Sequence, residues 1–494
     1  MKLSIVIPAY NREKLLAITL DYIAAQKDVD PNSYETIIVD DGSEDGTKGV
    51  YETYRRRIRH LKYVYRARDE RSCRSRARNL GLAESTGEMV MFLDTSMLLP
   101  NHFIRNLYRI MDEHPHPKLN IYHYMMGMWV EPGKHDLTVL DELTPDNMTD
   151  ITRRLLALPE WLDNREGLFQ LADHDLNKLA APWTLGWSGC YTVNRTFVQA
   201  AGGFDEAFLG WGAEDTDLSY RLYKLGARII ADSEAPALHL PHFSPKESSV
   251  QEVLNKRINN GKNLMLQHQK RYEFDTEFFQ LYPGPYYNHV LARFHSMSLM
   301  EIVPGYCGEL LGMLGAMLRE ETRTALIGSD LAYFIQGAGV TDVFLQNPNV
   351  IGPLGRRLPD VRMHYLLGLH TPFADNAFDT VVITDYIRAF PGRFAMRLLK
   401  EASRIGRRVI LLFTEEYNSV INWLDGQHWS DIELIRKSAA ANKLTVVELA
   451  RMESTRVLEL NGPPPRRVIT MENRTGEDGH SDKQPMPAGQ AAED

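Results

Sequence analysis

Three short apolar runs near the start of the chain constrain its fold more than any other feature. Residues 3–7, 36–39 and 89–93 are rich in aliphatic and β-branched side chains, which is typical of buried strands. Residues 13–26 carry leucine and isoleucine at helical spacing. This strand–helix–strand order predicts an α/β sheet whose ligands bind in the crevice outside the carboxyl ends of its strands.

Polar loops follow the predicted strands. Pro8 and Tyr10 follow the first strand, Asp41 follows the second, and an Asp-Thr-Ser sequence at 94–96 follows the third. Tyr10 could stack on a nucleotide base, and Asp41 could accept a hydrogen bond from the same base. An ordinary Asp-Gly turn explains Asp41 equally well, so the loops alone leave both interpretations open.

Arginines are concentrated between residues 66 and 78. If this segment is helical, Arg71, Arg74 and Arg78 share one face. A solvated charged face is the usual explanation of such a run. Beside a strand end, however, an arginine face suits a diphosphate, because guanidinium groups bind phosphate oxygens in pairs.

Residues 202–217 combine glycines, aromatic residues and acids in one stretch. Glycine allows positive φ and the close approach of a ligand, and the indole of Trp211 offers an apolar face to a sugar. Of the adjacent acids Glu214 and Asp215, one can take a proton while the other holds a hydroxyl. The simpler alternative is a glycine-rich turn before a helix that begins near Asp215, with Asp217 as a capping or supporting acid.

Four motifs in order resemble the family 2 inverting glycosyltransferases of the GT-A fold. They are Ile-Val-Ile-Pro-Ala-Tyr-Asn, Val-Asp-Asp-Gly-Ser, Ala-Arg-Asn-Leu-Gly and Phe-Leu-Asp-Thr-Ser. The stretch 202–217 is similar to the C-terminal part of galactosyltransferase-like and chondroitin-polymerase-like members. The resemblance covers about residues 1–245 and implies transfer of a sugar from a nucleotide diphosphate, with UDP the expected nucleotide, to an acceptor hydroxyl.

The resemblance also implies roles for single residues at the donor site. Pro8, Tyr10 and Asp41 would hold the base, usually uracil. Arg78, together with Arg74, would lie near the base or the diphosphate. The donor is expected to be a UDP-hexose or a UDP-N-acetylhexosamine.

For catalysis, the resemblance makes Asp215 the general base that deprotonates the acceptor hydroxyl. Glu214 would position the acceptor or the donor sugar. Trp183 is a further candidate for a sugar platform, although core packing is the commoner role of a single tryptophan. The residues expected to contact sugar or acceptor are Trp187, Gly189, Trp211 and Gly212.

The metal motif departs from the family pattern. The family has Asp-x-Asp, whereas this chain has Asp94 and then Ser96. A hydroxyl is a weaker ligand for Mn²⁺ or Mg²⁺ than a carboxylate, so Asp94 is expected to bind either the ribose or the cation. The family's metal-binding histidine best matches His242, with His239 as the alternative.

The second half again alternates strands and helices. Residues 322–460 resemble class I S-adenosylmethionine-dependent methyltransferases, after a helical connector at 246–321. The family's Gly-x-Gly-x-Gly loop is replaced by Gly-Ser-Asp at 328–330, so a backbone cannot approach the cofactor as closely. We therefore expect a degenerate, Rossmann-like domain with a structural or partner-binding role, followed by a disordered tail at 461–494.

Composition narrows the possible partners. The net charge of −9 without a long basic run argues against nucleic acid. Three widely spaced cysteines and no apolar window of membrane-spanning length predict a cytoplasmic protein, with membrane contact at most peripheral. Acceptors could be a glycan, a lipid-linked saccharide, a peptide or a small molecule. Two alternatives stay open: a bifunctional enzyme that also methylates, and a non-catalytic glycan- or nucleotide-binding module.

Overall fold

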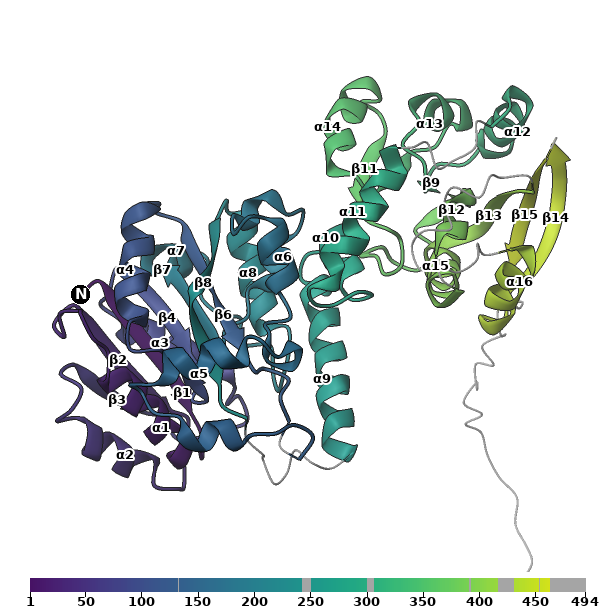
Figure 1. Ribbon diagram of the computed structural model, residues 1–494. Coiled ribbons are helices and arrows are strands. Elements are labelled where there is room, and N and C mark those ends of the chain that lie inside the picture. The colour runs from purple at the N-terminus through teal and green to yellow at the C-terminus, as the bar shows by residue number, and fades with distance from the viewer. Residues whose placement is uncertain are drawn as a thin grey trace, which may run out of the picture.

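Two separate β-sheets, joined by a set of helices, make up the chain in the computed structural model (Figure 1). The residues that the structure describes are 1–131, 133–241, 250–299, 306–390, 392–415, 431–452 and 454–462.

The first sheet is mixed and has eight strands, in the order β3-β2-β1-β4-β7-β6-β8-β5. Strands β1 to β4 are parallel, and β7 runs antiparallel to β4. The predicted strands of this half correspond to β1, β2 and β4, so the predicted α/β sheet is confirmed. The strands are β1 (Leu3–Ala9), β2 (Tyr34–Asp40), β3 (Leu61–Tyr65), β4 (Met89–Leu93), β5 (Met97–Leu98), β6 (Leu119–Met126), β7 (Cys190–Asn194) and β8 (Arg228–His239).

The helices of this half fill the connections between the strands. Helix α3 begins at Arg74, so Arg71 precedes the helix and the predicted three-arginine face is shorter than expected. The α-helices are α1 (Glu13–Ala24), α2 (Thr47–Tyr54), α3 (Arg74–Glu84), α4 (Phe103–Glu113), α5 (Met148–Leu155), α6 (Glu166–Leu171), α7 (Arg195–Ala200) and α8 (Glu214–Lys224). Short 3₁₀ turns are η1 (Thr138–Glu142), η2 (Pro159–Trp161), η3 (Leu176–Lys178) and η4 (Pro182–Leu185).

Both faces of β1 are buried, which explains its apolar sequence. Leu3 and Ile5 pack in one cluster with Leu16 of α1, whereas Val6 packs in a second cluster with Ala77 of α3. Successive side chains of a strand point to opposite faces, so one strand supplies both cores. The sheet is therefore held rigidly, and the loops at its carboxyl edge have fixed starting points.

Helices connect the two sheets. Helix α9 runs along the side of the first half, and α10 and α11 lead on to the second sheet (Figure 1). No helix in the described ranges is both long enough and apolar enough to cross a lipid bilayer. The connecting helices are α9 (Val250–Gln269), α10 (Phe274–Phe279), α11 (Tyr286–Leu299) and α12 (Gly308–Leu318).

The second sheet has seven strands, in the order β11-β10-β9-β12-β13-β15-β14. Strands β9 to β13 are parallel, and β15 runs antiparallel to β13 and β14. The strands are β9 (Thr324–Ile327), β10 (Asp342–Leu345), β11 (Arg362–Tyr365), β12 (Phe378–Ile383), β13 (Gly406–Thr414), β14 (Thr445–Met452) and β15 (Thr455–Asn461). The helices are α13 (Ala332–Ala338), α14 (Pro348–Arg357), η5 (Asp385–Ala389), α15 (Gly392–Ile405) and α16 (Ile432–Ala441).

This order confirms the alternating α/β architecture predicted for the second half, as a mixed sheet. The chain proceeds from β9 in one direction through β10 and β11, and then returns to the other side with β12. Such a reversal creates a crevice between β9 and β12 at the carboxyl ends of the strands. Residues 463–494, which include most of the predicted tail, lie outside the described residues.

Trp183 anchors the connecting helices to the first half. Its ring is fully buried, and its centroid lies 4.8 Å from the ring centroids of both Tyr220 and Phe279. The suggestion that Trp183 forms a sugar platform is therefore wrong, because a ring enclosed by other aromatic rings presents no face to a ligand.

Replacement of Trp183 by alanine is expected to lower the free energy of unfolding by about 3–5 kcal/mol, since it leaves a large cavity between aromatic rings. Trp129→Ala is the matched control, because the Trp129 ring is 57% exposed. The control is expected to change stability by about 0.5 kcal/mol or less. Urea denaturation followed by circular dichroism measures both, and equal small losses would contradict the packing described for Trp183.

Candidate active site

A cavity of about 1050 Å³ opens at the carboxyl ends of β1, β2 and β4. Most residues that sequence analysis assigned to donor binding or catalysis line it, together with the loop before α8. The predicted residues among its lining are Pro8, Tyr10, Asp41, Arg74, Arg78, Asp94, Ser96, Trp211 and Glu214.

Four predicted residues lie beside this cavity and are not among its described lining residues: Trp187, Gly189, Gly212 and Asp215. Trp187 is half-buried, and the guanidinium carbon of Arg165 lies 4.8 Å from its ring centroid. Its ring is therefore engaged by the protein on one face. The predicted metal ligand His242 lies outside the described residues.

Among the lining residues, two arginines form hydrogen bonds with Asp41. Arg68 Nη1 donates to Asp41 Oδ2 at 2.9 Å, and Arg66 Nη1 donates to Oδ1 at 3.1 Å. Burial raises the pKa of Asp41, and the charges of Arg68 and Arg66 partly offset that rise. The Arg68 guanidinium carbon also lies 3.8 Å from the centroid of the Tyr10 ring. Sequence analysis assigned no role to Arg68, because helical spacing directed attention to Arg74 and Arg78.

At the centre of the cavity, the buried guanidinium of Arg78 bridges two carboxylates. Its Nη2 donates to Asp94 Oδ1 at 3.1 Å and its Nη1 donates to Glu214 Oε1 at 3.3 Å. Burial lowers the pKa of Arg78, but the charges of Asp94, Glu214 and Asp215 more than offset this and raise it. Arg78 therefore joins the end of β4 to the start of α8, rather than lying free for a diphosphate.

The loop before α8 has an unusual backbone that only a few residues can adopt. Gly210 and Gly212 have φ angles of +78° and +103°, and Ala213 has a φ angle of +67°. A Cβ atom at Gly212 would lie 2.2 Å from Oδ1 of Asn260, so glycine is required there. Asn263 Nδ2 holds the loop from α9 by donating to the carbonyl oxygen of Gly212 at 2.8 Å. The acids that follow consequently begin a helix in a fixed direction.

Asp215 lies in the first turn of α8, directly after Glu214. Its Oδ1 accepts a hydrogen bond from the N–H of Thr216 at 2.8 Å, and its Oδ2 accepts one from the N–H of Ser188 at 3.4 Å. The carbonyl oxygen of Gly189 in turn accepts from the N–H of Asp94 at 2.9 Å. One short loop therefore links both acids.

The two adjacent acids differ in their chemistry. Burial and then the charge of Glu214 raise the pKa of Asp215 to about 7, while Arg78 and the two backbone N–H groups lower it. Glu214 instead forms an ion pair with Arg78. A carboxyl group with a pKa near the working pH is suited to accept a proton, so Asp215 is the better base of the pair.

Asp217, two residues after Asp215, fixes the position of α8. Its fully buried carboxylate accepts a hydrogen bond from Arg221 Nε at 2.9 Å and forms an ion pair with Arg271 Nη1 at 2.8 Å. Arg221 also donates to the carbonyl oxygens of Ala201 and Gly203. Through Arg221 and Arg271, Asp217 thus links α8 to the loop before it and to the turn that follows α9, which is consistent with the predicted supporting role.

Few protein ligands for a cation converge in the cavity. Asp94, Ser96 and His239 line it together, and His239 lies opposite Met97 in the β5–β8 pairing. In the described ranges, no group of three or more His, Cys, Asp or Glu side chains is placed to hold a metal. Asp94 and His239 would suit a divalent cation whose other ligands are diphosphate oxygens and water.

Aromatic residues and residues of α9 also line the cavity. Trp129 and Trp211 have exposed rings, with 57% and 42% of their surface accessible. Trp211 belongs to a recognisable motif, whereas the other lining residues of this group could not be predicted, because neither the segment after β6 nor α9 carries a motif. The other lining residues here are Met128, Val130, Glu131, Lys134, Val253, Lys256 and Asn259.

Comparison with known proteins identifies this half of the chain. The model for glycosyl transferase family 2 matches residues 4–156, and the model described as the N-terminal domain of galactosyltransferase matches residues 174–242. Residues 4–156 are therefore similar to family 2 glycosyltransferases and residues 174–242 to galactosyltransferases, and residues 4–242 are called the glycosyltransferase domain below. Neither match extends beyond residue 242.

Several known proteins are similar to parts of this chain. The validoxylamine A glucosyltransferase of Streptomyces hygroscopicus subsp. limoneus is 29% identical over 270 residues, covering 51% of this chain and 54% of the relative. The chondroitin synthase of Escherichia coli is 30% identical over 246 residues, covering 48% of this chain and 34% of the relative. The crystal structure of S. aureus TarS superposes with a TM-score of 0.38 at 18% identity, covering 65% of this chain and 49% of that one. The glycosyltransferase domain matches about half the length of the glucosyltransferase.

The Arg78 bridge predicts a sharp contrast between two arginines on the same helix. Arg78→Met is expected to lower the free energy of unfolding by about 3–5 kcal/mol, because it leaves two carboxylates without their buried partner. Arg74→Met, one turn earlier and exposed, is the control and is expected to cost about 0.5 kcal/mol or less. Thermal and urea denaturation measure both, and similar values for the two variants would contradict the bridge.

Proposed function

We propose that this chain is an inverting glycosyltransferase that moves a hexose or N-acetylhexosamine from a UDP donor to an acceptor hydroxyl. The observation that carries the proposal is the convergence of the strand-end loops with the first turn of α8. Asp94 and Glu214 share the Arg78 guanidinium, and the loop at 188–189 contacts both Asp94 and Asp215. A donor and a base can therefore meet at the end of β4.

The proposed reaction is a single displacement. Asp215 takes the proton of the acceptor hydroxyl, and the resulting oxygen attacks the anomeric carbon of the donor sugar. The bond between that carbon and the diphosphate oxygen breaks, and the nucleotide diphosphate leaves with both electrons of the bond. Attack from the face opposite the leaving group inverts the anomeric configuration.

The donor would lie along the carboxyl edge of β1, β2 and β4. Its base would rest on the face of Tyr10 away from Arg68, and Arg74 would neutralise part of the diphosphate charge. Exposed arginine at a helix start suits phosphate oxygens, because both the guanidinium and the helix dipole favour an anion. A UDP-hexose or UDP-N-acetylhexosamine is consistent with relatives named as glucosyl- and N-acetylglucosaminyltransferases.

The acceptor would bind at the far end of the cavity, between Trp129 and Trp211. Exposed indole rings suit the C–H faces of a sugar or cyclitol ring, whose hydroxyls then face the polar side chains. Relatives are named for validoxylamine A and for chondroitin, so a small molecule and a growing glycan are both candidate acceptors. A lipid-linked saccharide or a peptide that presents a hydroxyl fits the same chemistry.

A divalent cation, Mn²⁺ or Mg²⁺, would be held by Asp94 together with His239 or His242. When bound, it supplies positive charge that stabilises the leaving diphosphate. Ser96 stands where the family has an acid, so the cation would depend on the diphosphate for most of its ligands.

The most direct test is a panel of UDP-sugars with release of UDP as the readout, in the presence of Mn²⁺ and a set of candidate acceptors. Asp215→Asn is expected to lower the turnover number by about 10²–10⁴-fold, the range found when general-base catalysis is lost. UDP affinity measured by calorimetry should change little, because an asparagine keeps the size of the aspartate side chain. Full turnover in this variant would exclude Asp215 as the base, and UDP binding without turnover of any donor by the wild type would favour a binding module.

The pH dependence follows from the raised pKa of Asp215. A base must be deprotonated to accept a proton. We therefore expect kcat/KM to be low at pH values below about 7 and to rise as the pH increases through about 7. Because the charge of Glu214 contributes to the raised pKa, Glu214→Gln should move this limb to lower pH. One pKa unit corresponds to about 1.4 kcal/mol. A wild-type kcat/KM that stays constant between about pH 5.5 and 8.5 would contradict the assignment of Asp215 as the base.

Removal of the cation tests its role separately. Treatment with a chelator is expected to lower turnover at least about tenfold, because the leaving diphosphate loses its counter-charge, and added Mn²⁺ or Mg²⁺ should restore it. Ser96→Ala should have a smaller effect than His242→Ala. Equal rates with and without the chelator would show that a metal takes no part.

A further inference from the structure

The crevice of the second sheet is filled by the protein's own side chains. Between β9 and β12, a Cβ atom on Gly328 would lie only 2.4 Å from Cβ of Tyr386. Tyr386 is 3% exposed, and Thr384 Oγ1 donates to the carbonyl oxygen of Gly328 at 2.6 Å. The space over the first strand of this sheet, where a ligand of an open α/β sheet would lie, is therefore occupied.

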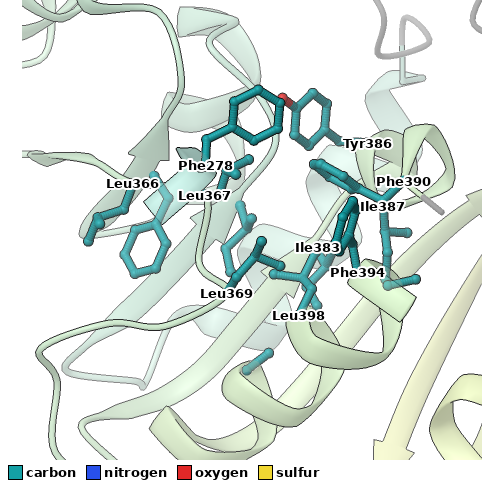
Figure 2. Close-up of a cluster of buried hydrophobic side chains, with 14 of the residues drawn as sticks. Phe278, Leu366, Leu367, Leu369, Ile383, Tyr386, Ile387, Phe390, Phe394 and Leu398 are labelled. Atoms are coloured by element: carbon teal, nitrogen blue, oxygen red, sulfur yellow. The ribbon is translucent and has the colours of Figure 1, made fainter. Parts of the chain in front are cut away.

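Helix α10 of the connector completes the filling. Figure 2 shows Phe278 facing Tyr386, with leucines from the loop after β11 on one side and side chains of η5 and α15 on the other. All of these side chains are buried in one cluster. The residues of this filling are Phe278, Leu366, Leu367, Leu369, Ile383, Tyr386, Ile387, Phe390, Phe394 and Leu398.

The loop after β11 binds α10 through a carboxylate. Glu277 Oε2 accepts from the N–H of Leu367 at 2.6 Å, and Oε1 accepts from the N–H groups of Leu369 at 2.5 Å and His370 at 2.9 Å. Successive backbone N–H groups that converge in this way form an anion-binding concavity. Here the group that fills the concavity is the Glu277 carboxyl of the connector, whose pKa is raised to about 7 by burial and lowered in part by these N–H groups.

The same helix reaches the glycosyltransferase domain. Tyr220 of α8 donates from its hydroxyl to Asp275 Oδ2 at 3.2 Å, and Tyr365 at the end of β11 donates to Asp275 Oδ1 at 2.9 Å. The Tyr220 hydroxyl has a single proton, which it shares with Glu273 Oε2 at 2.5 Å, so the contact with Asp275 is the weaker branch of this hydrogen bond. Asp275 is thus a shared acceptor between the helix that carries Asp215 and a strand of the second sheet.

We propose that the second domain is a clamp that takes helix α10 as its built-in ligand and, through Asp275 and Tyr365, holds α8 in the position that catalysis requires. S-adenosylmethionine has no room in the filled crevice, and the domain acts without it. Asp275 and Tyr365 are positioning residues, since neither lines the glycosyltransferase cavity. The effect on turnover rests on the proposed function, whereas the effect on the mobility of α8 does not.

Amide hydrogen exchange of the full chain tests the clamp without any turnover. In Tyr365→Phe, peptides that cover α8 should exchange about 3- to 10-fold faster, which corresponds to the loss of one ordinary hydrogen bond. Tyr333→Phe is the matched control, because Tyr333 is an exposed residue of α13 in the same domain. Asp275→Asn should also give faster exchange in α8, because it weakens the acceptor that Tyr220 and Tyr365 share. Unchanged exchange in α8 in both variants would overturn the proposal.

Two further readouts complete the test. In Tyr365→Phe the turnover number should fall, because Asp215 is displaced together with α8. KM for the donor should stay constant, because the loops after β1 and β2 keep their positions. S-adenosylmethionine at millimolar concentration should cause no shift in melting temperature and no heat in calorimetry. Saturable binding of S-adenosylmethionine by the wild type would overturn the claim that the crevice is filled. If exchange responds as expected but no donor is turned over, the clamp stands and the proposed glycosyl transfer fails.

Discussion

The buried ion pairs of Arg78 are the interaction on which the rest of the structure depends. A guanidinium removed from water costs several kcal/mol unless opposite charges lie beside it, so the two carboxylate partners of Arg78 must keep their places. One partner, Asp94, follows β4, and the other, Glu214, begins α8. The bridge therefore fixes the first turn of the helix over the end of the sheet, and Asp215, the next residue, is placed as a consequence.

The helix start is held from its outer side as well. Asn263 of α9 binds the loop at Gly212, and Asp217 ties α8 to Arg271 beyond the end of α9. Helix α10 then continues these contacts to the second sheet through Asp275. The connector is thus part of the framework of the proposed active site, and the domain that follows it is linked to α8, which carries Asp215, by a short series of packed side chains and hydrogen bonds.

The sequence predicted the architecture better than the pairings within it. Apolar strands and the loops that follow them are marked by short stretches of sequence. The strands β1, β2 and β4 could therefore be predicted, and so could the resemblance to glycosyltransferases. The role of Arg78 could not be predicted, because its partners come from distant elements. Trp183 could be misinterpreted, because the identity of a single residue does not show whether it is buried. The missing glycine loop near Gly328 did indicate a changed crevice, but its filling by Phe278, which lies far earlier in the chain, depends on tertiary packing alone.

The stereochemistry of the product tests the central claim most directly. If Asp215 delivers the acceptor oxygen from the face opposite the diphosphate, an α-linked UDP donor must give a β-linked product. The coupling constant of the anomeric proton in a nuclear magnetic resonance spectrum of the freshly formed product decides this. A β-linkage agrees with a single displacement assisted by Asp215, and a product that keeps the α-configuration would contradict it.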